Sequence, residues 1–172
     1  MGQLYRVVVT FCVAFQLASC AGTAAIESQS SQRDARLARI YFLREKGIIG
    51  ALGGTAAATE IKVDEKVVGS VTNGSYIFVD RPPGFHKLSV KTALSMAFET
   101  DVQVAAGREY YFNIGVPTTG APGTDLLNQV AAGGKGQQMR AQSPFPAVFS
   151  GAAFYSLDPA AGAAEIARLK AP

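Results

Sequence analysis

Apolar and polar residues alternate with a period near two through the middle of the chain, from Ala38 to Val116. A period of two is typical of strands that bury one face, and turn residues recur roughly every 8–12 positions, as they do in all-β domains. The pattern predicts about seven short strands. They lie near residues 39–43, 60–64, 67–71, 76–79, 87–91, 98–104 and 110–114.

A single open sheet of these strands would leave one face wet and two edges unpaired, so two packed sheets are expected. The predicted fold is therefore mostly β: a small antiparallel β-sandwich, with a closed barrel as the alternative. Asp64-Glu65-Lys66 predicts a tight turn, and Asn73-Gly74 predicts a hairpin because both residues tolerate a positive φ. Pro82-Pro83-Gly84 is expected to end the strand before it.

Two segments interrupt the strand pattern. Lys46 to Thr59 is rich in Gly, Ala and Ile and indicates either a loop over the end of the core or a small-residue docking surface. Residues 118–144 predict a Gly-, Pro- and Gln-rich loop, in which Thr124 or Asp125 caps a short helix.

The last part, residues 145–172, predicts an edge strand and a C-terminal α-helix. Asp158 at the N-cap and Pro159 at the first helical position mark the start of that helix. Ala163, Ile166 and Leu169 form a thin apolar stripe. The stripe is expected to pack on the sandwich, and docking of a partner is the alternative.

The amino terminus has the layout of a secretory signal peptide. A short basic segment is followed by an apolar run from Val7 to Leu17, which is too short to cross a bilayer, since crossing takes about 20 apolar residues. Leu17-Ala18-Ser19-Cys20 resembles a bacterial lipobox. The resemblance implies cleavage between Ser19 and Cys20, diacylglycerol on the Cys20 thiol and a mature chain that starts there. The alternative is an ordinary secreted protein cut near Ala21 or Ala24.

Residues 20–37 are small and polar and predict a flexible tether behind the lipidated residue. The chain thus divides into a signal peptide at 1–19, the lipidated tether, a β-sandwich core at 38–117, and the loop and C-terminal part described above. In lipoproteins of Gram-negative bacteria an Asp after the lipidated Cys signals inner-membrane retention. Ala21 stands there, and the resemblance therefore implies the outer membrane, facing the periplasm.

Composition narrows the class of protein. The chain has 172 residues, 48% hydrophobic and 17% charged, which excludes low-complexity disorder. Loss of Arg6 with the leader reduces the 16 basic residues to 15 against 13 acidic ones, a bias too weak to indicate nucleic acid. Cys12 would leave with the leader and Cys20 would be blocked, so the mature domain would have no free thiol for disulfides or for cysteine catalysis.

Residues that could carry chemistry are few. The single histidine, His86, excludes an HExxH zinc site and is expected to be solvated or to cap a turn, with a lone base beside a serine as the alternative. Glu99 and Asp101 share a strand face that is expected to be solvated. No metal, cofactor or catalytic residue is predicted. Several basic residues are expected to be scattered solubilising charges, with a basic surface as the alternative: Lys62, Lys66, Arg81, Lys87 and Lys91.

A set of short motifs occurs in a particular order between Ala38 and Val116. They are Arg39-Ile40-Tyr41-Phe42, Ile49-Gly50, the hairpin from Val63 to Val71, Asn73-Gly74-Ser75-Tyr76, Pro83-Gly84-Phe85-His86 and Ala106-Gly107-Arg108-Glu109-Tyr110-Tyr111. Their order and spacing resemble a family of bacterial lipoproteins that carry the domain of unknown function 2846. The resemblance implies a transthyretin-like β-sandwich behind a lipobox and supplies no enzymatic activity.

These observations favour a non-enzymatic, lipid-anchored envelope protein with a structural or protein-binding role. Its expected partners are the membrane, through Cys20, and another envelope protein. Two other hypotheses stay open: a small periplasmic hydrolase that uses a serine near Lys or His86, and a carrier of a small apolar ligand with the loop at Thr118–Gln142 as a lid.

Overall fold

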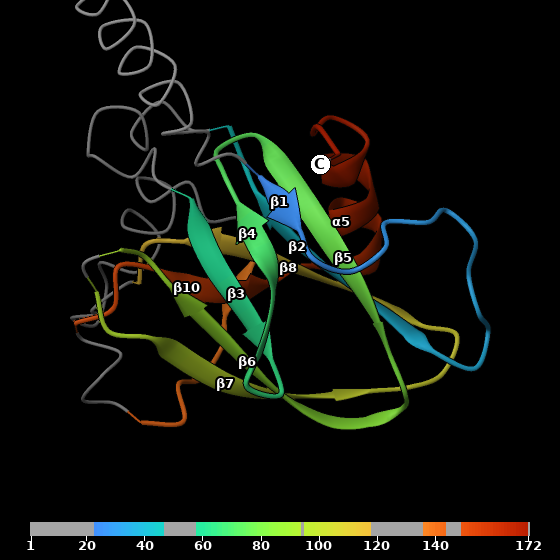
Figure 1. Ribbon diagram of the computed structural model, residues 1–172, viewed down its shortest axis with the longest axis horizontal. Coiled ribbons are helices and arrows are strands. Elements are labelled where there is room, and N and C mark those ends of the chain that lie inside the picture. Colours follow the sequence, from blue (N-terminus) through green and yellow to red (C-terminus); the bar gives the residue numbers. More distant parts are fainter. Residues whose placement is uncertain (1–22, 47–57, 94, 118–135, 144–148, 172) are drawn as a thin grey trace, which may run out of the picture.

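Two β-sheets pack face to face, and a short helix covers the outer side of one of them (Figure 1). The computed structural model describes residues 23–46, 58–93, 95–117, 136–143 and 149–171. The predicted signal peptide, the lipidation site Cys20, the segment at 47–57 and the helix at Thr124 or Asp125 lie outside these residues. The mostly β sandwich with a C-terminal helix is confirmed.

The first sheet, sheet A, is antiparallel throughout. Its strand order is β1 (Ala24–Ala25), β4 (Lys66–Val71), β3 (Thr59–Val63), β6 (Gly84–Lys91) and β7 (Phe98–Val104). The hairpin between β3 and β4 turns at Asp64 and Glu65, both of which have positive φ. The tight turn predicted from their sequence is therefore confirmed.

The second sheet, sheet B, is mixed. Its order is β5 (Ser75–Arg81), β2 (Ala38–Arg44), β8 (Glu109–Gly115), β10 (Ala153–Ser156) and β9 (Gln137–Gln138). β2 and β8 pair in parallel, with Arg39 opposite Glu109. The other strand pairs of the described sandwich are antiparallel, as predicted, and this pair is the exception. β2 and β8 are far apart in sequence, so no short turn forces them to run in opposite directions.

The core lies between the two sheets and is built by the alternating apolar positions. Ile40 and Phe42 of β2 face Ile61 and Val63 of β3, and all four are fully buried. Rings from both sheets meet in the middle, where Phe154 lies 6.3 Å from Phe98 between ring centroids. The sequence pattern predicted about seven strands between Ala38 and Val116, and the structure has seven there, β2 to β8.

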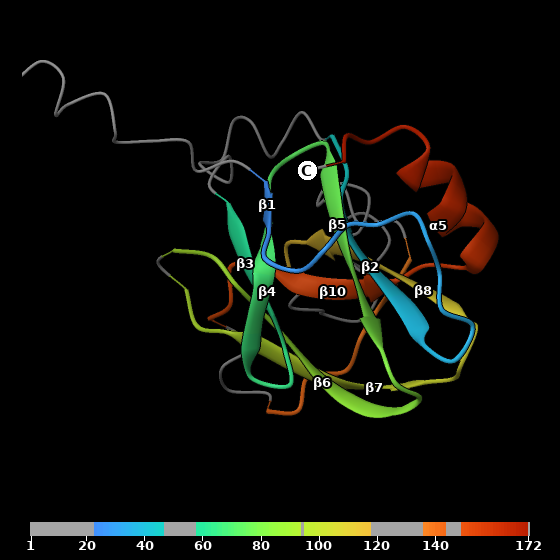
Figure 2. The same ribbon diagram turned by 45° about the vertical axis from the view of Figure 1, so that its right-hand side comes forward.

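The Asn73-Gly74 turn is not a hairpin. β4 belongs to sheet A and β5 to sheet B, so the turn carries the chain from one sheet to the other (Figure 2). Only Gly74 of the two has a positive φ, of 79°, whereas a type I′ hairpin turn needs two such residues. The Gly74 N–H donates instead to the carbonyl oxygen of Arg44 at the end of β2, which aligns β5 with sheet B.

Residues 136–142 close one side of the sandwich. β9 pairs with β10, so β10 is an inner strand, and the prediction of an edge strand there was wrong. The chain then crosses to sheet A, where the Gln142 N–H donates to the carbonyl oxygen of Glu99 on β7 at 2.9 Å. Part of the segment predicted as a loop therefore covers the edges of both sheets, because its backbone groups pair with strands that would otherwise stay open.

Helix α5 (Pro159–Ile166) begins as predicted, with the Asp158 side chain accepting from the Ala160 N–H at 2.9 Å. It packs on the outer face of sheet B at β8 (Figure 2). The buried residue of the helix is Gly162, and Ala163 is exposed, so the predicted stripe was misplaced. A Cβ at Gly162 would lie 2.2 Å from Cγ of Tyr111. Close contact with this ring requires a glycine at this position. A glycine has no side chain and therefore adds nothing to an apolar stripe.

Candidate functional site

Two ends of the sandwich can be distinguished by the direction of the strands. β3, β5, β7 and β10 begin, and β2, β4, β6 and β8 finish, at the end that holds Thr23. We call it the Thr23 end. The opposite end holds Phe85 at the start of β6 and is called the Phe85 end.

The chain is fixed on the sandwich from Thr23 onward, three residues after the predicted lipidation site. The Thr23 hydroxyl makes hydrogen bonds with the hydroxyls of Thr72, at 2.7 Å, and Ser75, and it accepts from the Thr72 N–H at 3.0 Å. Ala24 then pairs with Ser70 in β1. These contacts join the start of the described chain to the turn between β4 and β5.

Residues 23–37 form a strap across the open edge of β5. The side-chain amide of Gln29 donates to the carbonyl oxygen of Phe78 and accepts from its N–H, both at 2.8 Å. Glu27 pairs with the guanidinium of Arg81 at 2.6 Å. Farther along, Arg33 pairs with Glu109 of β8 at 3.0 Å. The strap runs from the Thr23 end toward the start of β8.

The prediction that this segment is a flexible tether was wrong for residues 23–37. Alternate side chains do point toward the sandwich, among them Ala25, Glu27 and Gln29, but most of the inward residues are polar. They contact backbone groups and charged side chains rather than the core. A search for apolar alternation cannot detect such a segment, because its period of two is carried by hydrogen-bonding residues.

An aromatic cluster lies on the outer face of sheet B between the strap and α5. Tyr41 of β2 stacks on Tyr111 of β8 with centroids 4.9 Å apart and planes at 4°, and it contacts Phe78 of β5 at 5.5 Å. The Arg39 guanidinium lies 4.0 Å from the Phe78 ring centroid and pairs with Asp80 through two hydrogen bonds of 2.8 Å. The guanidinium also donates to the carbonyl oxygen of Gln32 in the strap at 3.0 Å.

Burial sets the chemistry of this cluster. Burial and the nearby Glu109 carboxylate raise the pKa of the Tyr41 hydroxyl. Burial and the hydrogen bond of 2.8 Å to Glu109 raise the pKa of Tyr111 far above its usual value. Hydrogen bonding to Asp80 raises the pKa of Arg39. Both phenols stay neutral and the guanidinium stays charged at physiological pH.

His86 is buried and caps a turn. Its Nδ1 lies 2.7 Å from the Asp64 carboxylate, and its Nε2 lies 2.9 Å from the carbonyl oxygen of Pro82. Both partners are acceptors, and each ring nitrogen is placed to donate an N–H to its partner. His86 thus joins the turn between β3 and β4 to the turn between β5 and β6. In the described chain its ring nitrogens are engaged by these two groups and not by a serine hydroxyl.

A family model described as Protein of unknown function (DUF2846) matches residues 34–123. The chain belongs to this family. The matched part of the DUF2846 chain contains β2 to β8, whereas β1, β9, β10 and α5 lie outside it. No curated protein matches the chain. Among the described residues, no helix is long and apolar enough to span a membrane.

The charged residues of the DUF2846 chain are mostly interleaved with opposite charges. Lys62 lies 3.5 Å from Glu60, and Lys87 lies 3.7 Å from Glu99. Asp101 accepts from the side chain of Gln142 at 2.6 Å. The lysines of β3 and β6 therefore do not form a continuous basic surface on sheet A. Across the described ranges, no three His, Cys, Asp or Glu side chains are grouped as metal ligands would be.

Proposed function

We propose that this DUF2846 chain is a lipid-anchored protein of the bacterial cell envelope whose sandwich has a non-catalytic, structural or protein-binding role. The observation that carries the proposal is the fixed position of Thr23, three residues after the cysteine of Leu17-Ala18-Ser19-Cys20. A lipobox cysteine followed at once by a folded domain suits a protein held at a membrane surface. The absence of Asp after Cys20 favours the outer membrane as its location.

The short distance along the chain from Cys20 to Thr23 determines how close to the membrane the domain would lie. Three residues separate Cys20 from Thr23, and an extended chain spans at most about 3.6 Å per residue. The Cα atoms of the two residues are then within about 11 Å of each other. Two or more acyl chains on one residue give durable anchoring, since each buried methylene contributes about 0.8 kcal/mol. Such an anchor would hold the sandwich against the headgroups.

The contacts of the polar residues support a binding rather than a catalytic role. His86 is occupied by Asp64 and Pro82 and holds two turns together. The half-buried Tyr41 and the buried Tyr111 stack on each other. The functional surfaces of the domain are then its exposed ends and faces, where an envelope partner would bind.

Mass spectrometry of the mature amino-terminal peptide tests the proposal. The expected peptide begins at Cys20 and carries a diacylglycerol thioether, and globomycin, which blocks lipoprotein signal cleavage, should cause the precursor to accumulate. An unmodified peptide that begins at Ala21 or Ala24 would contradict the proposal. Density-gradient separation of the membranes then tests the location, with the chain expected in the outer-membrane fraction.

A further inference from the structure

Three exposed lysines lie at the Thr23 end. Lys46 follows β2, and its aliphatic part lies against Gly74. The backbone N–H of Lys170 donates to the carbonyl oxygen of the same glycine at 3.1 Å. Lys91 is the last residue of β6. Over the residues that the structure describes, none of the three lysines forms an ion pair.

The carboxylates near these lysines have other partners. Glu45 accepts from the side-chain amide of Asn113 at 3.4 Å, and Glu60 lies 3.5 Å from Lys62. At the Phe85 end several cations are neutralised, as in the pair of Lys87 with Glu65 at 3.8 Å. The Thr23 end therefore offers positive charge that is available to an external anion.

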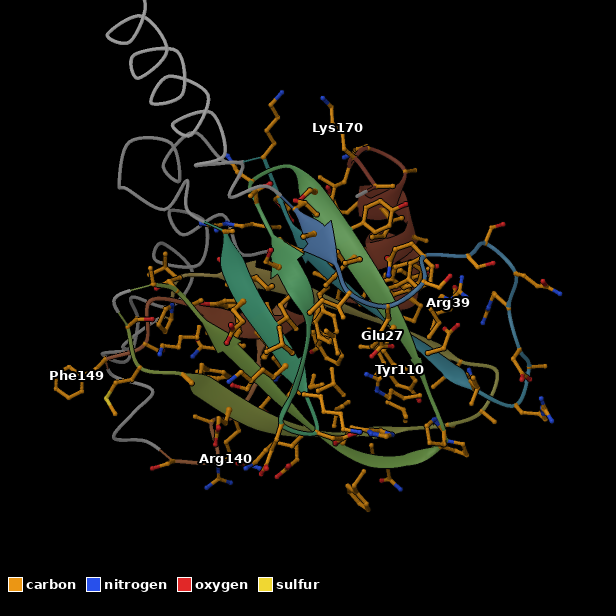
Figure 3. The ribbon with its side chains drawn as sticks, viewed as in Figure 1. Glu27, Arg39, Tyr110, Arg140, Phe149 and Lys170 are labelled. Carbon is orange, nitrogen blue, oxygen red and sulfur yellow. The ribbon has the colours of Figure 1, made fainter. Side chains whose placement is uncertain are left out.

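Exposed apolar side chains accompany the lysines. Met96 precedes β7, Val116 follows β8 and Phe149 precedes β10, and 44%, 46% and 57% of their surfaces are exposed. The Met96 N–H donates to the carbonyl oxygen of Phe149 at 3.3 Å, so these two residues are neighbours. Figure 3 shows Phe149 and Lys170 at two corners of the molecule, on the side where β7 and β5 begin.

We infer that the Thr23 end is the surface that faces the bilayer. The lysines contact anionic phospholipid headgroups, and Phe149 and its apolar neighbours enter the headgroup region. Lysines beside exposed apolar side chains are the combination that binds at a membrane interface. The inference rests on the proposed function, because the anchor on Cys20, within about 11 Å of Thr23, brings this end to the membrane first.

The chain contains no tryptophan, so one introduced tryptophan reports on its own position. Phe149→Trp places the reporter at the Thr23 end. Phe85→Trp is the matched control, because Phe85 is 75% exposed at the opposite end. Each mature chain is anchored on vesicles of phosphatidylethanolamine and phosphatidylglycerol that contain a brominated phosphatidylcholine. The bromine atoms quench the fluorescence of a tryptophan that lies among the lipids.

The expected result is a loss of emission and a blue shift for Phe149→Trp, with neither change for Phe85→Trp. Equal quenching of both reporters, or quenching of Phe85→Trp alone, would overturn the inference. In the Phe149→Trp background, joint replacement of Lys46, Lys91 and Lys170 by Gln should reduce the quenching. Replacement of Lys66 and Arg108, at the Phe85 end, by Gln should leave the quenching of Phe149→Trp unchanged. Quenching that is unchanged by the triple replacement would refute the role of the lysines.

Failure of the anchor is distinguished from failure of the orientation. If mass spectrometry finds no lipid on Cys20, the proposed function fails. A chain produced without the leader, so that it begins at an unlipidated Cys20, can then be coupled through that thiol to a maleimide phospholipid, and the same two reporters are compared. Unquenched Phe149→Trp on either anchor overturns the orientation by itself.

Discussion

The side-chain amide of Gln29 occupies the place of a neighbouring strand beside Phe78. It donates to the carbonyl oxygen and accepts from the N–H of that one residue, both at 2.8 Å. Phe78 lies on β5, the edge strand of sheet B, where such groups would otherwise be open to pairing with another chain. The strap therefore belongs to the fold.

We expect Gln29→Ala to lower the free energy of unfolding by about 1.5–4.5 kcal/mol, because three hydrogen bonds to the backbone are lost, two with Phe78 and one to the Glu27 carbonyl oxygen, at about 0.5–1.5 kcal/mol each. Urea unfolding followed by circular dichroism measures the change. Gln32→Ala is the matched control, since Gln32 contributes only backbone atoms to the hydrogen bonds described. Equal effects of the two variants would show that the Gln29 amide does not secure the strap.

Arg39→Lys should destabilise the domain by about 1–3 kcal/mol although the charge is kept. Lysine cannot reproduce the two-pronged pair with Asp80, nor the stacking on Phe78. Arg36→Lys, at an exposed arginine paired with Asp34, is the control and should change stability by less than about 0.5 kcal/mol. Thermal and urea unfolding of both variants measure the difference. Arg39→Lys with wild-type stability would contradict the assigned packing role.

Gly162→Ala should also destabilise, in spite of the better helix propensity of alanine, which favours the variant by about 1 kcal/mol. The new Cβ would lie 2.2 Å from Cγ of Tyr111, so α5 must shift away from β8. Overpacking of this kind costs about 1–3 kcal/mol. In a Tyr111→Ala background the same substitution should become neutral or stabilising. A double-mutant cycle by urea unfolding gives the coupling, and additivity of the two changes would contradict the contact.

The stability of the domain should depend on pH through Asp64. Burial raises the pKa of this carboxyl, but hydrogen bonds from His86 and from the Lys87 N–H outweigh burial and hold the pKa below its usual value. A carboxyl with a lowered pKa in the folded state contributes stability above its unfolded pKa of about 3.9 and loses it as the pH falls through the folded value.

The wild type should therefore exceed Asp64→Asn in stability at pH 7 and at pH 5, and the difference should shrink below about pH 4. Urea unfolding at several pH values measures it. A difference that stays constant from neutral pH down to pH 3 would show that Asp64 does not act through its charge.

The strands were predictable because their alternation is carried by apolar residues such as Ile61, Val63, Leu88 and Val90, all fully buried. Turn chemistry was less informative. Asp64-Glu65 does form the expected hairpin, whereas Asn73-Gly74 passes between sheets, because backbone contacts with Arg44 decide which strand β5 joins. A dipeptide specifies a reversal of the chain but not the partner of the next strand.

The strap and the helix contact could not be predicted for a related reason. Gln29 and Glu27 act through hydrogen bonds and charge, and Gly162 acts through the absence of a side chain. None of these features gives a hydropathy signal. His86 was placed correctly at a turn, but its partner Asp64 lies on another hairpin, which only the stacking of the strands brings near.

A lipid on Cys20 is proposed to hold the domain at the membrane, and fractionation of cells that carry Cys20→Ala tests this attachment. The wild type should sediment with the membranes, and Cys20→Ala should be lost from them, either to the soluble periplasmic fraction or as an uncleaved precursor of higher mass. A mature-sized Cys20→Ala chain that sediments with the membranes as the wild type does would show that the lipid does not hold the domain there.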